Sequence, residues 1–150
     1  MSFIGSLISA QGAKEAGKRA QMAYKYNASI NEQNATAIRT KSDWEESQSR
    51  EKNSKLRSTQ RALYAKANVD LSSGSPLLVL AETAGKAEAE AQAIRWGGDV
   101  AVAEQRNMAT LNRFYGKTAK KAGDTQSNAY IGQAVGQAGE TAMNIYKIKG

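Results

Sequence analysis

The side chains that could do chemistry in this chain are carboxylates, amines and guanidines, because Cys and His are both absent from its 150 residues. Their absence removes thiol nucleophiles, the usual general base and the commonest transition-metal ligands. Glu45 and Glu46 are adjacent, so on a helix they project about 100° apart and cannot face one substrate as an acid and a base. Glu88 and Glu90 likewise do not share one helix face, so they are also unsuited to act as an acid and a base on one substrate. We therefore expect no catalytic, cofactor-binding or metal site, and no enzymatic activity.

Positive charge is the remaining chemical feature. The net charge is +7, and residues 1–70 contain twelve Lys and Arg against seven Asp and Glu. Such an excess favours contact with nucleic acid or acidic lipid, although a solvated helix face of mixed charge is the commoner cause. By this count the excess belongs to the first half of the chain. The residues expected to face DNA are Lys41, Arg50, Lys52, Lys55, Arg57 and Arg61.

The stretch 70–76 divides the elements that must position these charges. It combines Asp, Ser and Gly residues with Pro76, the only proline of the chain. These residues favour a turn, and Ser75 followed by Pro76 is typical of a helix N-cap and first helical position. The sequence therefore predicts an elbow at 70–76 between two helices, at 13–69 and 77–122. An ordinary loop between two helices of a bundle is the alternative.

The helix at 13–69 has an Ala-rich apolar stripe, and its middle section is polar on all sides. Three amides, Asn27, Asn31 and Asn34, share one face, where they would either set the register of a helix seam or form a polar outer surface. Trp44 lies in the polar section and is a candidate contact for a partner, the alternative being an exposed aromatic on its own helix. The predicted stripe consists of Ala13, Ala16, Ala20, Ala23, Asn27, Ile30, Asn34, Ile38, Leu56, Leu63 and Ala67.

The helix at 77–122 has a clearer heptad pattern with mostly small residues. Gly98 is either a kink or close crossing point, or it ends the helix together with Gly97. Gly123 is expected to close this helix, so that a separate C-terminal helix follows at 124–148. The predicted heptad positions are Leu77, Leu80, Ala84, Ala87, Ala91, Ile94, Gly98, Ala101, Gln105, Met108, Asn112, Tyr115, Ala119 and Ala122.

Two further segments are candidates for contact with other molecules. Residues 1–12 contain Phe3, Ile4, Leu7 and Ile8, which could dock on a partner, enter a membrane interface or pack on a neighbouring helix. In the C-terminal helix Gly132 and Gly136 form a G-x-x-x-G motif, which favours close contact between helices. The surrounding residues are polar, so packing on a neighbouring helix is expected, with an interfacial or ring-lining helix as the alternative.

The fold class expected from these patterns is all-α: a long antiparallel helical hairpin with a C-terminal helix. Large apolar residues are few compared with Ala, so a single copy would bury only a thin core. Burial of that size does not offset the entropy of ordering the chain. We therefore expect the hairpins to assemble into a multimer.

The order of these features resembles the small internal virion proteins, or ejection proteins, of T7-like short-tailed phages. The resemblance covers residues 10–120 and consists of the amide-rich stretch 27–35, the basic stretch 55–62, the elbow Leu71-Ser72-Ser73-Gly74-Ser75 and the Ala/Glu-rich helix up to Ile94-Arg95. The elbow and its flanks are its most specific part.

The resemblance implies a structural protein without enzymatic activity, stored in the virion interior near the portal or core. On infection it would pass into the host cell envelope and help form a conduit for the genome in the outer membrane. The partners it implies are other copies of the chain, portal, core or tail proteins, phage DNA and the host outer membrane. One alternative is an assembly adaptor that stays in the particle, docked on the portal or tail. Another is a free helical protein that binds nucleic acid.

Overall fold

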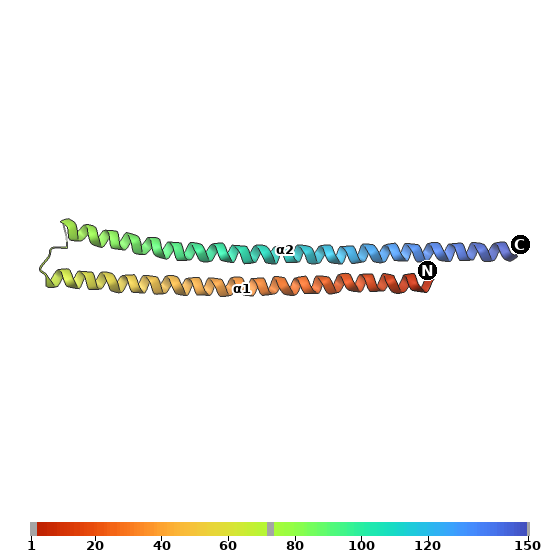
Figure 1. Ribbon diagram of the computed structural model, residues 1–150, viewed down its shortest axis with the longest axis horizontal. Helices are drawn as coiled ribbons and strands as arrows, with labels where there is room; N and C mark the ends of the chain where they lie inside the picture. The colour runs from red at the N-terminus through yellow and green to blue at the C-terminus, as the bar shows by residue number, and fades with distance from the viewer. Residues whose placement is uncertain (1–2, 72–73, 150) are drawn as a thin grey trace. The chain divides into compact units, whose positions relative to one another are not determined.

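The chain forms two helices in a computed structural model that describes residues 3–71 and 74–149. Helix α1 (Phe3–Lys66) and helix α2 (Gly74–Lys149) pack against each other, and the described residues contain no strand (Figure 1). Proline is absent from the α1 sequence, and Pro76 lies in the first turn of α2, where its missing N–H has no helical partner to lose. The predicted all-α helical hairpin is confirmed.

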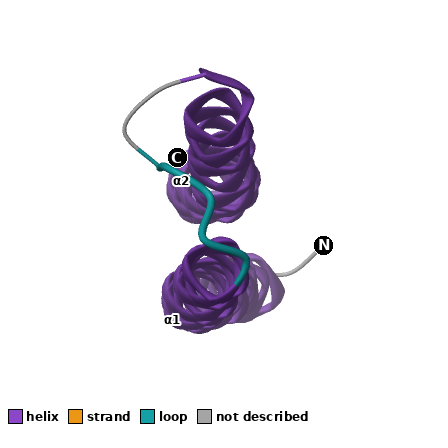
Figure 2. Cartoon of the chain, turned by 90° about the vertical axis from the view of Figure 1, so that its left-hand side faces the viewer, coloured by secondary structure: helices purple, strands orange, loops and turns teal. Residues whose placement is uncertain are grey.

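Helix α1 ends in a Schellman motif centred on Asn68. The backbone of Asn68 has a φ of +52°, in the left-handed region that asparagine tolerates better than most residues. The Val69 amide donates to the Tyr64 carbonyl oxygen at 3.0 Å, and the Asn68 amide donates to the Ala65 carbonyl oxygen at 3.1 Å. These two bonds satisfy the last carbonyl groups of the helix and turn the chain out of it. Figure 2 shows the loop that follows.

The structure corrects several predicted boundaries. The first helix starts at Phe3, so the segment 1–12 is the beginning of α1 and not a separate element; Met1 and Ser2 lie outside the described residues. It ends at Lys66 and not at residue 69, because Asn68 provides the cap. The second helix starts at Gly74, inside the predicted elbow 70–76, of which Ser72 and Ser73 lie outside the described residues.

Helix α2 also continues where the sequence predicts breaks. It runs through Gly97-Gly98 and through Gly123, so the predicted C-terminal helix 124–148 is part of α2. Glycine in a helix costs about 0.5–1 kcal/mol relative to alanine, which packing against a second helix can offset. At Gly98 and Gly123 the neighbouring helix provides that packing, as described below.

The hairpin divides into two compact units. Unit 1 comprises residues 1–31 and 107–150, and unit 2 comprises residues 32–106. Unit 2 contains the turn, while unit 1 combines the N-terminal part of α1 with the C-terminal part of α2. Within each unit, a segment of α1 packs against a segment of α2.

In unit 2 the closest approach of the helices is at Ser42 and Gly98. A Cβ atom on Gly98 would overlap the side chain of Ser42, whose Oγ donates to the Ile94 carbonyl oxygen at 3.1 Å. By contrast, a Cβ on the adjacent Gly97 would meet no atom within 4 Å. Of the two alternatives for this glycine pair, the close crossing is therefore confirmed, and it rests on Gly98 alone.

In unit 1 the corresponding approach is at Gly17 and Gly123. A Cβ atom on Gly123 would lie 2.7 Å from the Ala13 carbonyl oxygen and 2.8 Å from the Gly17 Cα. Seven residues earlier on α2, a Cβ on Gly116 would lie 3.1 Å from the Cβ of Tyr24. The two backbones can approach this closely only because these positions lack side chains.

The interhelical seam is made of small residues throughout. Among the described side chains the buried positions are Ser6, Ala10, Gly17, Ala28, Ala35, Ser42 and Ser49 on α1, and Ala91, Val102, Ala109, Gly116, Gly123, Ser127 and Ala134 on α2. All but Val102 are Gly, Ala or Ser, and many are seven residues apart. This spacing is the heptad repeat of helices that wrap around each other.

The predicted stripes are partly out of register with this seam. On α1 the seam runs through Ala28 and Ala35, and Asn27 and Asn34 are exposed. Of the two alternatives for these amides, the polar outer surface therefore applies, and their place in the predicted apolar stripe is wrong. Asn31 is half-buried. On α2 the prediction is one residue early at three positions, where Ala109, Gly116 and Gly123 are buried in place of Met108, Tyr115 and Ala122. A seam this close excludes larger side chains.

We predict opposite effects for alanine at the two adjacent glycines. Gly98→Ala should destabilise the protein by about 1–3 kcal/mol, because the new methyl group overlaps Ser42. Gly97→Ala should stabilise it by about 0.5–1 kcal/mol, because alanine is the better helix former and has free space there. Urea unfolding followed by circular dichroism measures both. Combining Gly98→Ala with Ser42→Gly should recover part of the loss, and equal effects of the two single substitutions would contradict this crossing point.

Candidate functional site

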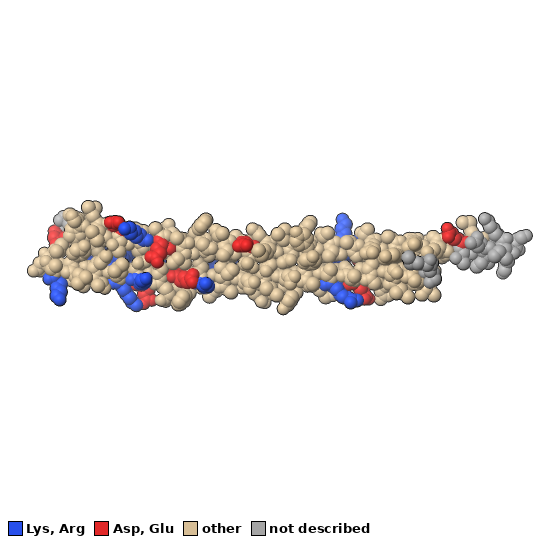
Figure 3. Space-filling model, in the orientation of Figure 1, with Lys and Arg blue, Asp and Glu red and all other residues tan. Residues whose placement is uncertain are grey.

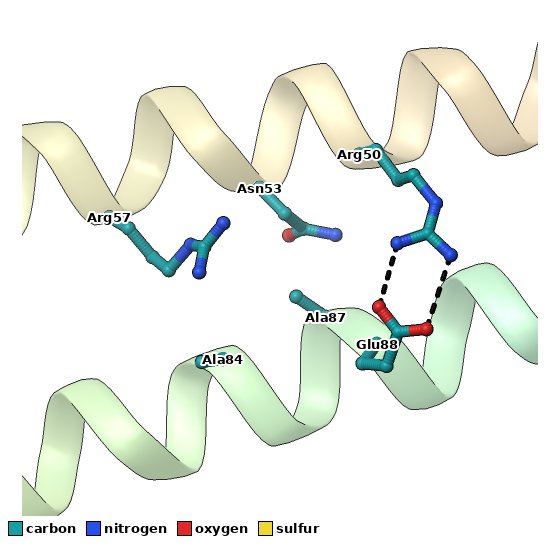
Figure 4. A pocket seen from close by; sticks show the side chains of 6 residues that line it. All are labelled: Arg50, Asn53, Arg57, Ala84, Ala87 and Glu88. Atoms are coloured by element: carbon teal, nitrogen blue, oxygen red, sulfur yellow. Dashed lines mark hydrogen bonds and ion pairs between the residues drawn. The ribbon is translucent and has the colours of Figure 1, made fainter.

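The central basic stretch of α1 in unit 2 forms an ion-paired groove with α2. Arg50 makes two bonds to Glu88 on α2, Nη1 to Oε2 at 2.7 Å and Nη2 to Oε1 at 3.1 Å (Figure 4). Its Nε also donates to Oε1 of Glu46 at 2.8 Å. Two carboxylates therefore bind one guanidinium, the planar geometry for which arginine is well suited. The groove has a volume of about 240 Å³ and is lined by Arg50, Asn53, Arg57, Ala84, Ala87 and Glu88.

These contacts shift the protonation equilibria of the groove. The hydrogen bonds from Arg50, followed by one from Gln92, lower the pKa of Glu88 below its usual range. The same contacts with Glu88 and Glu46 raise the pKa of Arg50. All of these groups are in contact with solvent, so salt weakens their attraction.

Further polar contacts join α1 to α2 within unit 2. The Asn53 amide donates to Glu90 at 3.2 Å and to Ser49 on its own helix at 3.3 Å. Arg39 and Asp99 form an ion pair at 3.4 Å. Because several pairs of different chemistry occur along the seam, a shift of one helix relative to the other would break them together. Polar contacts of this kind can fix register even where they add little stability.

The six residues predicted to face DNA all lie in unit 2, and their contacts favour the mixed-charge alternative. Lys41 is 3.7 Å from Glu45, Lys55 is 2.6 Å from Glu51, and Arg50 is held by the two glutamates described above. Figure 3 shows acidic and basic side chains side by side toward the turn. Arg57 and Arg61 line grooves beside the seam, and Lys52 is exposed.

The candidate docking residues are mostly on the outside of the hairpin. Phe3, Ile4, Leu7 and Ile8 have exposed fractions of 41–68%, and Trp44 is 62% exposed. The G-x-x-x-G motif is not at the interhelical contact, because Cβ atoms on Gly132 and Gly136 would meet no atom within 4 Å. Among these candidates, Gly98 lies at the close crossing with Ser42, and Asn31 is half-buried.

Sequence reasoning missed how the fold distributes charge. Unit 2 contains eleven basic and eleven acidic residues, so its net charge is zero. Unit 1 contains ten basic and three acidic residues, so the whole net charge of +7 belongs to it. The antiparallel pairing combines a basic segment near the start of the chain with another beyond residue 107. The Lys and Arg residues of these two segments are the functional candidates that a count along the chain overlooks.

Comparisons with protein-family models, with curated proteins and with solved structures find no match to this chain. Within the described residues, neither helix has a stretch that is apolar enough to cross a membrane. The same part of the chain contains no group of three acidic, Cys or His residues that could hold a metal ion. The function must therefore be argued from the seam, the exposed apolar residues and the charge distribution.

We predict that the Arg50–Glu88 contact makes the stability of the hairpin depend on pH. The pKa of Glu88 is lowered in the folded chain, so its contribution is present above the ordinary glutamate pKa and is lost as the pH falls through the lowered value. Glu88→Gln should therefore lower the melting temperature at pH 7, and the difference from the natural chain should shrink toward pH 3. Circular dichroism melts test this. Glu104→Gln, at an exposed site on the same helix, is the control, and an unchanged difference across this pH range would contradict the prediction.

Proposed function

We propose that this chain is a structural phage virion protein without enzymatic activity, stored inside the capsid near the portal or core. On infection it is ejected into the host envelope, where it helps to form the conduit for genome delivery. The proposal rests on the resemblance of residues 10–120 to ejection proteins and on one structural observation: the seam buries Gly, Ala and Ser and leaves the large apolar side chains exposed.

The exposed apolar residues support assembly with other copies. In unit 2, Trp44, Trp96 and Val100 are 49–71% exposed, and in unit 1 Ile4, Ile8 and Phe114 are 62–68% exposed. Burying a large apolar side chain contributes about 1.5–3 kcal/mol, which these residues do not gain within one copy. Contacts between neighbouring hairpins would provide that burial. Residues near the turn and residues near the chain ends could both contribute.

A seam of small residues also suits a protein that must pass through a narrow tail. Removing an alanine or serine from water contributes less than removing leucine or phenylalanine, so separating the helices of one copy costs little. The same helices become stable once copies associate, because binding of the folded form favours folding. The protein would therefore lose its packed state easily during transfer and regain it on assembly.

The second candidate function is an assembly adaptor that remains in the particle. Its support is the N-terminal turn of α1, where Phe3, Ile4, Leu7 and Ile8 are exposed together within six residues. Exposed apolar patches of this kind commonly mark protein interaction sites. In this function they would dock on a portal or tail protein.

A comparison of full particles with particles that have released their DNA distinguishes the two functions. We expect the protein to be present in full particles and lost, together with the genome, from particles triggered to release their DNA. Quantitative immunoblotting against a portal protein, which stays in the particle, measures this ratio. Retention of the protein in emptied particles would contradict ejection and favour the adaptor.

We also predict that the purified chain self-associates. Its melting temperature should rise with protein concentration, and sedimentation velocity should show species larger than one copy. Trp44→Ser combined with Trp96→Ser should shift the equilibrium toward single copies, since both indoles are exposed and their loss removes no buried contact. A chain that stays monomeric, with a melting temperature independent of concentration, would contradict the assembly on which this function depends.

A further inference from the structure

One side of unit 1 has two rows of cations that lie next to each other. On α1, Lys14, Lys18 and Lys25 are four and seven residues apart, so they share one helix face. On α2, Arg113, Lys117 and Lys120 are four and three residues apart, so they also share one helix face. The two rows meet beside the Gly17–Gly123 contact, where the helix backbones are closest. We call these six residues the basic face.

Contacts around Asp124 show that the two rows lie on the same side. Lys14 of α1 lines a groove of about 300 Å³ together with Lys120 and Asp124 of α2. A hydrogen bond from Lys120, with weaker attraction from Lys14 and Lys18, lowers the pKa of Asp124. Residues from both helices therefore act on one carboxylate. Its ion pair, at 2.8 Å, is with Lys120.

The basic face differs from the charged residues of unit 2 in its pairing. Within the described residues, Lys14, Lys18, Lys25 and Lys117 form no ion pair, whereas in unit 2 Lys41, Arg50 and Lys55 of α1 each pair with a glutamate. Like charges on one side of the helix pair repel each other, and Asp124 offsets only part of this repulsion. An anionic partner with several charges would relieve it.

We propose that the basic face is a binding surface for the phosphate backbone of double-stranded nucleic acid. Two rows of amines and guanidines match a polymer with closely spaced phosphates, which cations bind without reading sequence. This inference does not depend on the proposed virion function, because it concerns the isolated chain. The basic face contains none of the residues expected from the sequence to face DNA, all of which lie in unit 2.

The surroundings of the basic face favour a duplex over a single strand and over a lipid surface. Single strands are bound by stacking bases on aromatic rings. The nearby rings of Phe114 and Tyr115 follow Arg113 by one and two positions, so they project away from its face. Tyr115 packs at a tilt against Tyr24, with ring centroids 5.9 Å apart. At the end of the basic face formed by Lys14 and Lys120, the groove is lined by polar groups apart from Ile131, whereas membrane binding would need several apolar side chains there.

The test measures binding of the full chain to a 30-base-pair duplex by fluorescence anisotropy at several salt concentrations. The triple variant Lys14→Gln, Lys18→Gln, Lys117→Gln removes three phosphate contacts, so the slope of log K against log salt should become shallower by about 2.7. The affinity in 100 mM salt should fall roughly 10- to 100-fold. All three side chains are exposed, so the fold should be unaffected, which circular dichroism checks.

The matched control is the triple variant Lys41→Gln, Lys52→Gln, Lys86→Gln, which removes the same charge from exposed positions of unit 2. It should bind the duplex as the natural chain does. The conservative variant Lys14→Arg, Lys18→Arg, Lys117→Arg should keep the salt slope. Asp124→Asn should bind several-fold more tightly, because it frees Lys120 from its ion pair. An unfolded variant would not produce such a gain.

Three results would overturn the proposal. Equal loss of affinity in both lysine-to-glutamine variants would show that only net charge matters. Absence of duplex binding by the natural chain at low salt would show that the face is merely solvated. Binding to vesicles of phosphatidylglycerol without binding to the duplex would assign the face to a lipid surface.

Discussion

The close approach of α1 and α2 through a seam of Gly, Ala and Ser is the constraint on which the rest of the structure depends. Where Gly17 meets Gly123, and where Gly98 meets Ser42, there is no room for a larger side chain. Such a contact gains many weak dispersion interactions between backbones but buries little apolar side-chain surface. The large apolar residues of the chain are consequently left on the outer faces of the helices. The seam thus determines both the modest stability of one copy and the surface available to others.

A seam of small residues has little intrinsic preference for register, because alanines are nearly interchangeable along a helix. The polar contacts supply that preference. Buried Ser42 bonds to the Ile94 carbonyl oxygen, and Arg50 reaches Glu88 with both ends of its guanidinium. A shift by one helical turn would leave the buried Ser42 hydroxyl without its partner and would separate Arg50 from Glu88, so these contacts favour one register even though the exposed ion pair adds little stability. Specific pairing and low overall stability are therefore compatible in this hairpin.

The hairpin was predictable from sequence, whereas the residues at its seam were predictable only in part. Helix α2 has Ala, Ile and Gly at spacings of three and four, and Ala84, Ala91 and Gly98 lie where that pattern places them. Two of the three errors in α2 share one cause: assigning large apolar residues to the inside favours Met108 and Tyr115, whereas the narrow seam takes Ala109 and Gly116. In α1, alanine occurs on several faces, so periodicity cannot select one. The end of α1 at Asn68 could not be predicted, because asparagine tolerates the left-handed backbone conformation found there but does not require it.

The charge distribution could not be predicted by counting along the chain, because folding brings together segments that are far apart in sequence. Residues 1–70 have the larger basic excess, yet cations in their second half meet carboxylates on their own helix or on α2, namely Arg39, Lys41, Arg50 and Lys55. The cations near the chain start meet another basic segment instead. Unit 2 thus balances its charges internally, as ordinary helix pairs do, and unit 1 does not. Since uncompensated like charges destabilise a folded structure, binding of an anion would stabilise unit 1, in the way that Glu46 and Glu88 neutralise Arg50 in unit 2.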